Sequence, residues 1–151
     1  MKYCGTLLSV SDMEKSKYFY EKVMEQKIIM DLGVHVSFES GLSLQSNYEE
    51  LIGVKLEMHS KPNNFQLYFE VEDLNYWENK LKSTPGIEFI HERKEYPWGQ
   101  CVIRFYDYEK YIVEVAESMV SVAKRFLKQG LTLEETAKRT MFPVELLKQF
   151  L

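Results

Sequence analysis

Apolar and polar residues alternate along short segments and then recur at helical spacing, in the same order twice. In the first half, alternation predicts strands over residues 2–10, 27–31, 34–39 and 42–45. A helix is expected between the first two strands, beginning with a capping box of Ser11 and Glu14 and ending near Met24. In the second half, strands are predicted over 65–71, 87–92, 100–106 and 111–116, with a helix over about 74–82.

Individual residues repeat together with this order of elements. Leu8-x-Val10-x-Asp12 matches Phe69-x-Val71-x-Asp73, and Leu42-x-Leu44-Gln45 matches Tyr111-x-Val113-Glu114. We therefore expect an α+β fold in which two tandem βαβββ modules, at about 1–47 and 65–117, form a cleft-shaped mixed sheet with outer helices. A C-terminal helical extension over 118–151 is expected to follow this domain of residues 1–117.

Composition and charge narrow the class of protein. The chain has 151 residues, which suits one domain with a small appendage. No apolar run approaches the roughly 20 residues of a membrane span, and the N-terminus does not read as a signal peptide, so we expect a cytoplasmic protein with no membrane association. The formal net charge is −4. Residues 118–151 are nevertheless basic, with six Lys or Arg against three Asp or Glu.

The repeated pattern resembles the vicinal oxygen chelate superfamily, which includes glyoxalase I, extradiol dioxygenases, fosfomycin-resistance enzymes and bleomycin-resistance proteins. In the first module the resemblance rests on Val10-Ser11-Asp12 and Lys17-Tyr18-Phe19-Tyr20. In the second it rests on Val71-Glu72-Asp73, Trp98-Gly99, Phe105-Tyr106-Asp107 and Tyr111-Ile112-Val113-Glu114. It covers about residues 1–117, and it implies the fold without fixing the reaction, because one fold hosts many chemistries.

The resemblance also points to four positions for metal ligands. In the superfamily's metal enzymes, ligands come from the first and last strands of each module, and the matching positions here are Gly5, Gln45, Gln66 and Glu114. Gly5 has no side chain, the two amides are weak ligands, and only Glu114 is a normal anionic ligand. We interpret the metal site as vestigial and expect no cofactor. The alternative is a divalent ion held weakly by Glu114, Gln45, Gln66 and water.

Strand alternation assigns the side chains of one face to a cleft. The residues expected to bind a ligand there are His35, Gln45, Gln66, Tyr68, Arg104, Tyr106 and Glu114, with Trp98 on a loop at the cleft mouth. Arg104 and Glu114 are expected to form an ion pair between neighbouring strands, and His35 is the one histidine expected in the cleft. A polar face is equally typical of an antiparallel sheet with one side in water.

The last 34 positions show a helical period throughout. An amphipathic helix is predicted over 118–129, a second begins with a capping box at Thr132, and a third is expected to start at Pro143 and end at Leu151. Residues 130–146 look like the short helix-turn-helix tail of many bacterial proteins. Only Lys148 and Gln149 suit a DNA contact, so we expect packing on the body or on a second subunit, with nucleic-acid binding through 130–151 as the alternative.

Three functions follow from these observations. The first is a metal-free homodimer, similar to the drug-sequestering resistance proteins, which binds a small polar or aromatic ligand without turnover. The second is a lactoylglutathione-lyase-like or dioxygenase-related enzyme that uses Glu114 as a metal ligand or base. The third is a regulator that senses a ligand in the cleft and acts through its helical tail. The resemblance implies the dimer, since relatives often build the cleft across subunits.

Overall fold

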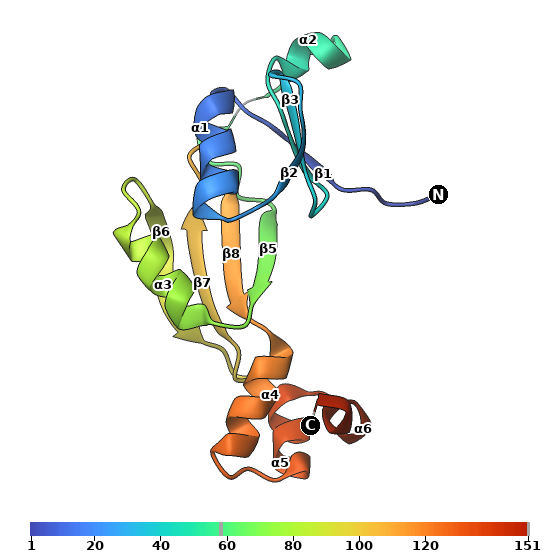
Figure 1. Cartoon of the computed structure of the whole chain (residues 1–151), viewed down its shortest axis with the longest axis vertical. Helices are drawn as coiled ribbons and strands as arrows, with labels where there is room; N and C mark the ends of the chain where they lie inside the picture. The colour runs from blue at the N-terminus through green and yellow to red at the C-terminus, as the bar shows by residue number, and fades with distance from the viewer. Residues whose placement is uncertain (58, 151) are drawn as a thin grey trace.

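The computed structural model describes residues 1–57 and 59–150 and contains two βαβββ modules (Figure 1). The first module comprises β1 (Thr6–Ser9), α1 (Met13–Tyr18), a π-helical turn (Phe19–Val23), β2 (Ile28–Asp31), β3 (His35–Phe38) and β4 (Leu42–Gln45). A short helix, α2 (Tyr48–Ile52), lies in the connection. The second module comprises β5 (Gln66–Val71), α3 (Leu74–Ser83), β6 (Glu88–Glu95), β7 (Cys101–Tyr106) and β8 (Ile112–Glu117). The α+β class and the two-module organisation are confirmed.

The strands of each module form a separate four-stranded sheet with the same topology. The orders are β1-β4-β3-β2 and β5-β8-β7-β6, so the first strand of each module is parallel to the last and lies at one edge of its sheet. The registers differ by two residues, because Ser9 pairs with Gln45 whereas its counterpart Glu70 pairs with Ala116. This shift brings Glu114 opposite Tyr68.

Helix α1 and its π-helical turn join the two modules, because their buried side chains pack against both sheets. The Phe19 ring lies 6.4 Å from that of Phe105 in the second sheet, and the Tyr20 ring lies 6.0 Å from that of Phe38 in the first. The Tyr20 hydroxyl also donates a 2.6 Å hydrogen bond to Asp107. Apolar burial therefore forms one continuous core across the modules.

The internal repeat is visible in the helix caps. Asp12 caps α1 by accepting from the Lys15 amide, and its counterpart Asp73 caps α3 in the same way. The predicted capping box at Ser11 is wrong. Both the amide and the hydroxyl of Ser11 donate to Glu109 in the turn after β7, so Ser11 serves the contact between modules.

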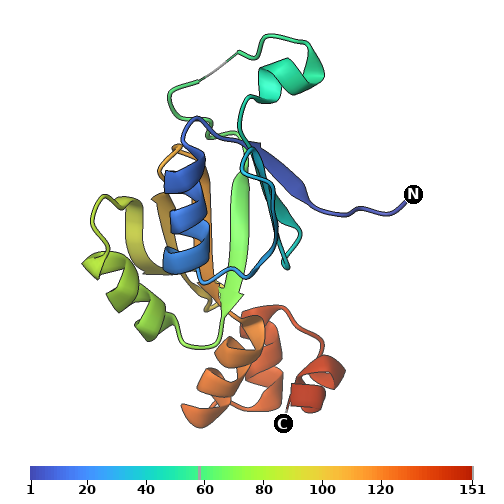
Figure 2. The same cartoon turned by 45° about the horizontal axis from the view of Figure 1, so that its top comes forward.

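Three short helices follow β8 and lie beyond one end of the second sheet (Figures 1 and 2). They are α4 (Met119–Lys128), α5 (Leu133–Thr140) and α6 (Val144–Leu147), which continues as a 3₁₀ turn (Lys148–Phe150). The capping box at Thr132 is confirmed, whereas Pro143 is the N-cap of α6 and Leu151 lies outside the described residues. Among the described residues, no helix is long and apolar enough to cross a membrane.

The C-terminal helices pack on the body through α4, whose Val122, Ala123 and Phe126 are buried. This agrees with the predicted packing of the tail. In the last helix, Lys148 lies 2.8 Å from Glu145, which offsets its charge. Nucleic-acid binding through residues 130–151 stays a prediction.

Candidate functional site

Three predicted site residues meet on the second sheet, on neighbouring strands. Arg104 of β7 stands opposite Glu114 of β8, and its Nη2 lies 2.5 Å from the Glu114 Oε2. Gln66 of β5 donates its amide to the same oxygen at 2.8 Å and accepts from the Arg104 Nε at 3.2 Å. The three side chains form a closed ring of charge-assisted hydrogen bonds, and the predicted ion pair is present.

Two further residues contact Arg104: His91 lies on β6, and Tyr96 lies in the turn that follows it. The Arg104 Nη1 donates to the His91 Nε2 at 3.0 Å and to the Tyr96 hydroxyl. Because the His91 Nε2 accepts, its proton sits on Nδ1, which donates to the carbonyl of Glu92 at 2.8 Å. Neither residue was expected in the site from the sequence.

Trp98 and Tyr68 are brought together by a residue that the sequence did not single out. Gln100 accepts from the Trp98 indole at 3.0 Å and donates to the Tyr68 hydroxyl at 3.2 Å. The Tyr68 hydroxyl in turn donates to Glu70 at 2.6 Å. Partial burial, followed by the hydrogen bond to Glu70, raises the pKa of Tyr68 to about 12, so its hydroxyl stays protonated and acts as a donor.

The remaining predicted residues lie elsewhere on the two sheets. Tyr106 shares the face of Arg104, and its ring lies 4.6 Å from the Lys61 Nζ. In the first sheet, the His35 Nδ1 contacts the Gln45 amide oxygen and its Nε2 contacts the Ser37 hydroxyl, each at 2.9 Å. Since the Gln45 amide nitrogen donates to a backbone carbonyl, the Gln45 oxygen accepts from the His35 Nδ1.

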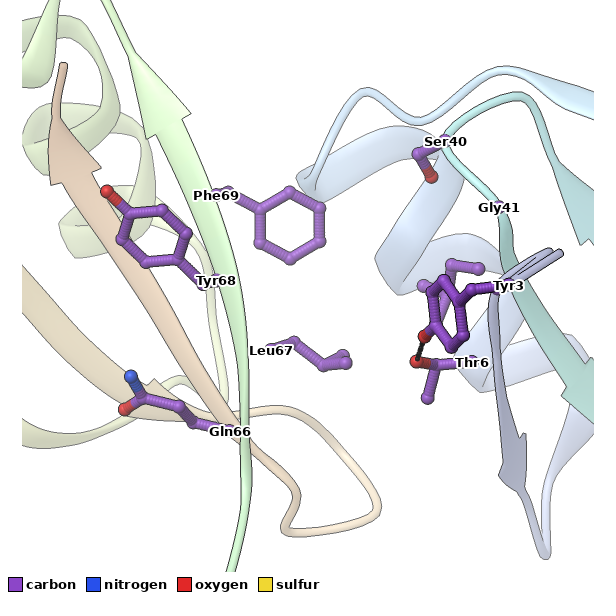
Figure 3. A pocket seen from close by; sticks show the side chains of 10 residues that line it. Tyr3, Thr6, Ser40, Gly41, Gln66, Leu67, Tyr68 and Phe69 are labelled. Atoms are coloured by element: carbon purple, nitrogen blue, oxygen red, sulfur yellow. Dashed lines mark hydrogen bonds between the residues drawn. The ribbon is translucent and has the colours of Figure 1, made fainter. Parts of the chain in front are cut away.

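Within one chain, the polar cluster around Arg104 on the second sheet and the one around His35 on the first sheet do not meet. Figure 3 shows Gln66 and Tyr68 pointing away from the first module, while Leu67 and Phe69 point toward it. The hollow between the modules, of about 290 Å³, is lined by these β5 residues and by Tyr3, Gly5, Thr6, Ser40, Gly41 and Leu42. The single cleft expected from strand alternation is therefore not formed by contacts within the chain.

The four positions that match metal ligands make a poor donor set. Gly5 adopts a φ of +152°, and a Cβ there would lie 1.8 Å from the carbonyl oxygen of Gly41. A larger residue at this position therefore needs a backbone shift. Gln45 is bound to His35, and Glu114 is bound to Arg104. Among the residues described, no three His, Cys, Asp or Glu side chains are arranged to hold a metal ion.

Comparisons with known proteins agree with this architecture. Residues 3–120 match the family model described as a glyoxalase-like domain. The chain is 32% identical over 102 residues to metallothiol transferase FosB of Bacillus licheniformis; this alignment covers 67% of the chain and 65% of FosB, slightly less than two thirds of its length.

Solved structures show the same fold. A protein of unknown function from Agrobacterium tumefaciens is 33% identical with a TM-score of 0.71, over 78% of this chain and 94% of that one. A lactoylglutathione lyase from the same organism is 20% identical with a TM-score of 0.60, over 78% and 93% of the two chains. The second likeness concerns the fold alone.

Proposed function

This chain belongs to the glyoxalase-like family, and from that premise we propose that it binds a small polar or aromatic molecule without a metal ion and without turnover. The resemblance to drug-sequestering members of the superfamily supports binding as the activity. The family alone does not decide the reaction, because its fold carries many chemistries.

The observation that carries the proposal is the place of Arg104. Glu114 is the one anionic side chain among the four positions that match metal ligands, and it lies 5% exposed against the Arg104 guanidinium. A divalent cation on the same carboxylate would have to displace the guanidinium or lie beside it, and like charges at such distances repel strongly in a partly buried site. Because the donor set does not fit a metal ion, we derive no step through one.

The groups around Arg104 indicate the chemistry of the ligand. Tyr96 and Trp98 stack on each other with their ring centroids 4.8 Å apart, and Tyr68 is 48% exposed beside them. Glu70 adds an exposed carboxylate that contacts the Tyr68 hydroxyl. Aromatic rings offer stacking area and a carboxylate accepts hydrogen bonds, so a planar molecule with an amine or hydroxyl donor suits this face.

A second copy of the chain is part of the proposal. The polar faces of the two sheets belong to different modules and do not meet within one chain, so a cleft lined by both requires a homodimer. Light scattering coupled to gel filtration tests this. A mass of about twice 17.9 kDa supports the shared cleft, and a monomer at working concentrations contradicts it.

Metal-dependent chemistry is the second candidate, favoured by the name of the relative FosB, a metallothiol transferase. In this chain the reaction would be lyase-like or dioxygenase-related. It would require Glu114 to give up its contact with Arg104 and bind the metal ion instead. Metal-dependent turnover, measured for the wild-type protein and for Arg104→Ala, distinguishes the two candidates. In the variant the guanidinium no longer competes with a metal ion for Glu114. Metal-dependent turnover in the wild-type protein supports the enzyme, whereas its absence in both proteins supports binding alone.

The binding activity is tested by titrating a panel of aromatic amines and aromatic alcohols and following the protein by NMR. We expect a binder to shift the Trp98 indole resonance and to bind about tenfold more weakly to the Glu70→Gln variant, since a charged acceptor is lost. Glu50→Gln, on the exposed helix α2, is the matched control. If no compound of the panel binds this face, the proposal is wrong.

A further inference from the structure

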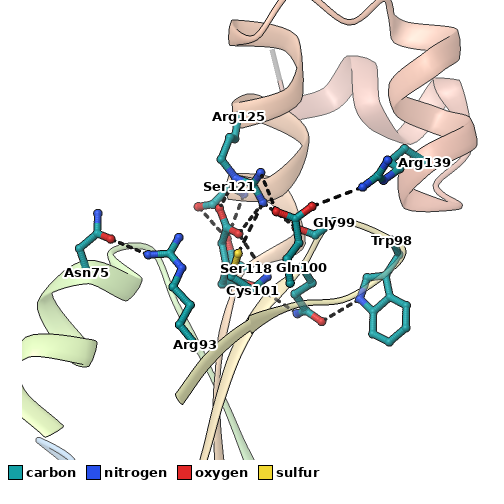
Figure 4. A network of polar contacts seen from close by, with 12 residues as sticks. Asn75, Arg93, Trp98, Gly99, Gln100, Cys101, Ser118, Ser121, Arg125 and Arg139 are labelled. Atoms are coloured by element: carbon teal, nitrogen blue, oxygen red, sulfur yellow. Dashed lines mark hydrogen bonds and ion pairs between the residues drawn. The ribbon is translucent and has the colours of Figure 1, made fainter. Parts of the chain in front are cut away.

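The turn between β6 and β7 carries Tyr96 and Trp98, two aromatic residues of the proposed ligand face. Figure 4 shows Trp98 and Gly99 of this turn beside Arg125 of α4. Two backbone hydrogen bonds close it, from the Tyr96 amide to the Gln100 carbonyl at 2.9 Å and from the Gly99 amide to the Tyr96 carbonyl at 2.8 Å. On one side of the turn, Tyr96 contacts the Arg104 guanidinium and Trp98 stacks on Tyr96. The position of this turn therefore sets the surroundings of Arg104.

The other side of the turn is bound by α4. The Arg125 Nη2 donates to the Gly99 carbonyl at 2.6 Å and to the Glu117 Oε2 at 3.0 Å, while its Nε donates to the Glu117 Oε1 at 3.1 Å. Its Nη1 also lies 3.8 Å from Glu95, which Arg139 of α5 approaches at 3.4 Å. A planar guanidinium can make all these contacts at once, whereas an ammonium group cannot.

Close packing reinforces the same contact. Gly99 has a φ of +90°, and a Cβ there would lie 2.2 Å from the ring of Phe126, so the α4 helix approaches the turn as closely as a glycine permits. The start of α4 is fixed independently, because the hydroxyls of Ser118 and Ser121 donate to Glu72 at 3.0 and 2.7 Å. Helix α4 is thus held at both ends and cannot move without disturbing the turn.

We propose that the C-terminal helices position the ligand face, and that Arg125 is the positioning residue. Through Gly99 and Glu95 it fixes the turn that sets Tyr96 against Arg104 and Trp98 against Tyr96. The family match ends at residue 120, so this role belongs to a part of the chain beyond the matched domain. Its importance for binding rests on the function proposed above, but the contact itself does not require a ligand.

The test is NMR of the full-length protein without any ligand, comparing wild type with Arg125→Gln. The reporters are the Trp98 indole proton, bound to Gln100, and the Arg104 Nε proton, bound to Gln66. Loss of the Arg125 contacts with the turn should accelerate solvent exchange of both protons about fivefold to tenfold, the effect of losing roughly 1 kcal/mol of local stability. The indole resonance of Trp77, on α3, should not move.

A second variant keeps the test decisive if Arg125→Gln unfolds. Glu95→Gln removes an exposed carboxylate that both arginines approach, and it should give a smaller change in the same direction. Lys124→Gln, an exposed neighbour on the same helix, is the matched control. Arg125→Lys should restore the reporters only partly. If the Arg125 and Glu95 variants are folded and both reporters behave as in wild type, the positioning role is wrong, whatever a ligand screen finds.

Discussion

Arg104 and Glu114 face each other on adjacent strands, with a guanidinium nitrogen 2.5 Å from a carboxylate oxygen. Glu114 is the residue that matches the last metal ligand of the superfamily. The positively charged Arg104 guanidinium thus binds the carboxylate that a metal ion would need as a ligand. Because the pair is largely removed from water, each partner depends on the other for its solvation.

The first prediction concerns this pair. Arg104→Ala should lower the free energy of unfolding by roughly 3 kcal/mol, because it leaves the Glu114 charge buried and uncompensated. The double variant Arg104→Met with Glu114→Leu should recover most of that loss, since two apolar side chains need no partner. Urea unfolding of the single variants Arg104→Met and Glu114→Leu and of their double variant gives the coupling energy. Strictly additive effects would contradict the paired geometry.

The second prediction concerns pH and Asp107. Burial raises the pKa of Asp107 to about 6, against a partial opposing effect of the Tyr20 hydroxyl. A raised pKa means that the folded protein binds the proton more tightly, so this group stabilises the fold at low pH and loses that contribution as pH rises through about 6. Between pH 8 and pH 5 the gain should be about 1 kcal/mol.

Asp107→Asn isolates this contribution from the titration of other groups. It keeps an oxygen for the backbone amides of Glu109 and Tyr111, which donate to the Asp107 Oδ1. The difference in unfolding free energy between wild type and variant should therefore change by about 1 kcal/mol between pH 5 and pH 8. Parallel pH profiles for the two proteins would show that the buried carboxyl does not titrate in this range.

The third prediction compares two glycines with positive φ. Gly5→Ala meets the Gly41 carbonyl oxygen at 1.8 Å, whereas no heavy atom of the described residues lies within 4 Å of the new Cβ in Gly33→Ala. We expect Gly33→Ala to cost about 1 kcal/mol for its backbone conformation alone, and Gly5→Ala to cost about 2 kcal/mol more. Thermal unfolding measures both. Equal losses would mean that the chain start relaxes freely away from Gly41.

The fourth prediction compares two buried threonines of α5. Thr136 is 0% exposed and its hydroxyl has no hydrogen-bond partner among the residues that the structure describes, whereas the Thr140 hydroxyl donates to the Thr136 carbonyl at 2.8 Å. Thr136→Val should stabilise the protein by about 1 kcal/mol, and Thr140→Val should destabilise it by a similar amount. The same chemical change thus has opposite signs at two positions one helical turn apart, which calorimetry can resolve.

Sequence patterning predicted the fold well because its signals are local. Alternation located the eight strands of the two modules. The repeat matched Asp12 with Asp73, which cap α1 and α3, although the predicted cap of the first helix was Ser11. Arg104 and Glu114 were predicted to be neighbours, and Gln66 to share their face, because all three lie on regular strands, where alternation gives the face of a side chain.

The missed residues lie where that rule fails. β6 carries register shifts on both sides of His91, so alternation along it does not predict that His91 stands opposite Arg104. Tyr96 and Gln100 lie in and beside a turn, where alternation does not give the direction of a side chain, and they contact Arg104 and the Glu117 carbonyl. His35 and Gln45 keep their predicted face, but their separation from the second sheet depends on how the modules pack.

The central claim is that the site works without a metal ion, and metal content tests it most directly. Protein purified without chelators is subjected to elemental analysis and then titrated calorimetrically with Ni²⁺, Zn²⁺, Mn²⁺ and Fe²⁺, with Glu114→Gln as the matched control. We predict less than stoichiometric metal in the purified protein and no binding that the Glu114 variant loses. One equivalent of tightly bound metal in wild type, absent from Glu114→Gln, would contradict the account and favour a metal-dependent enzyme.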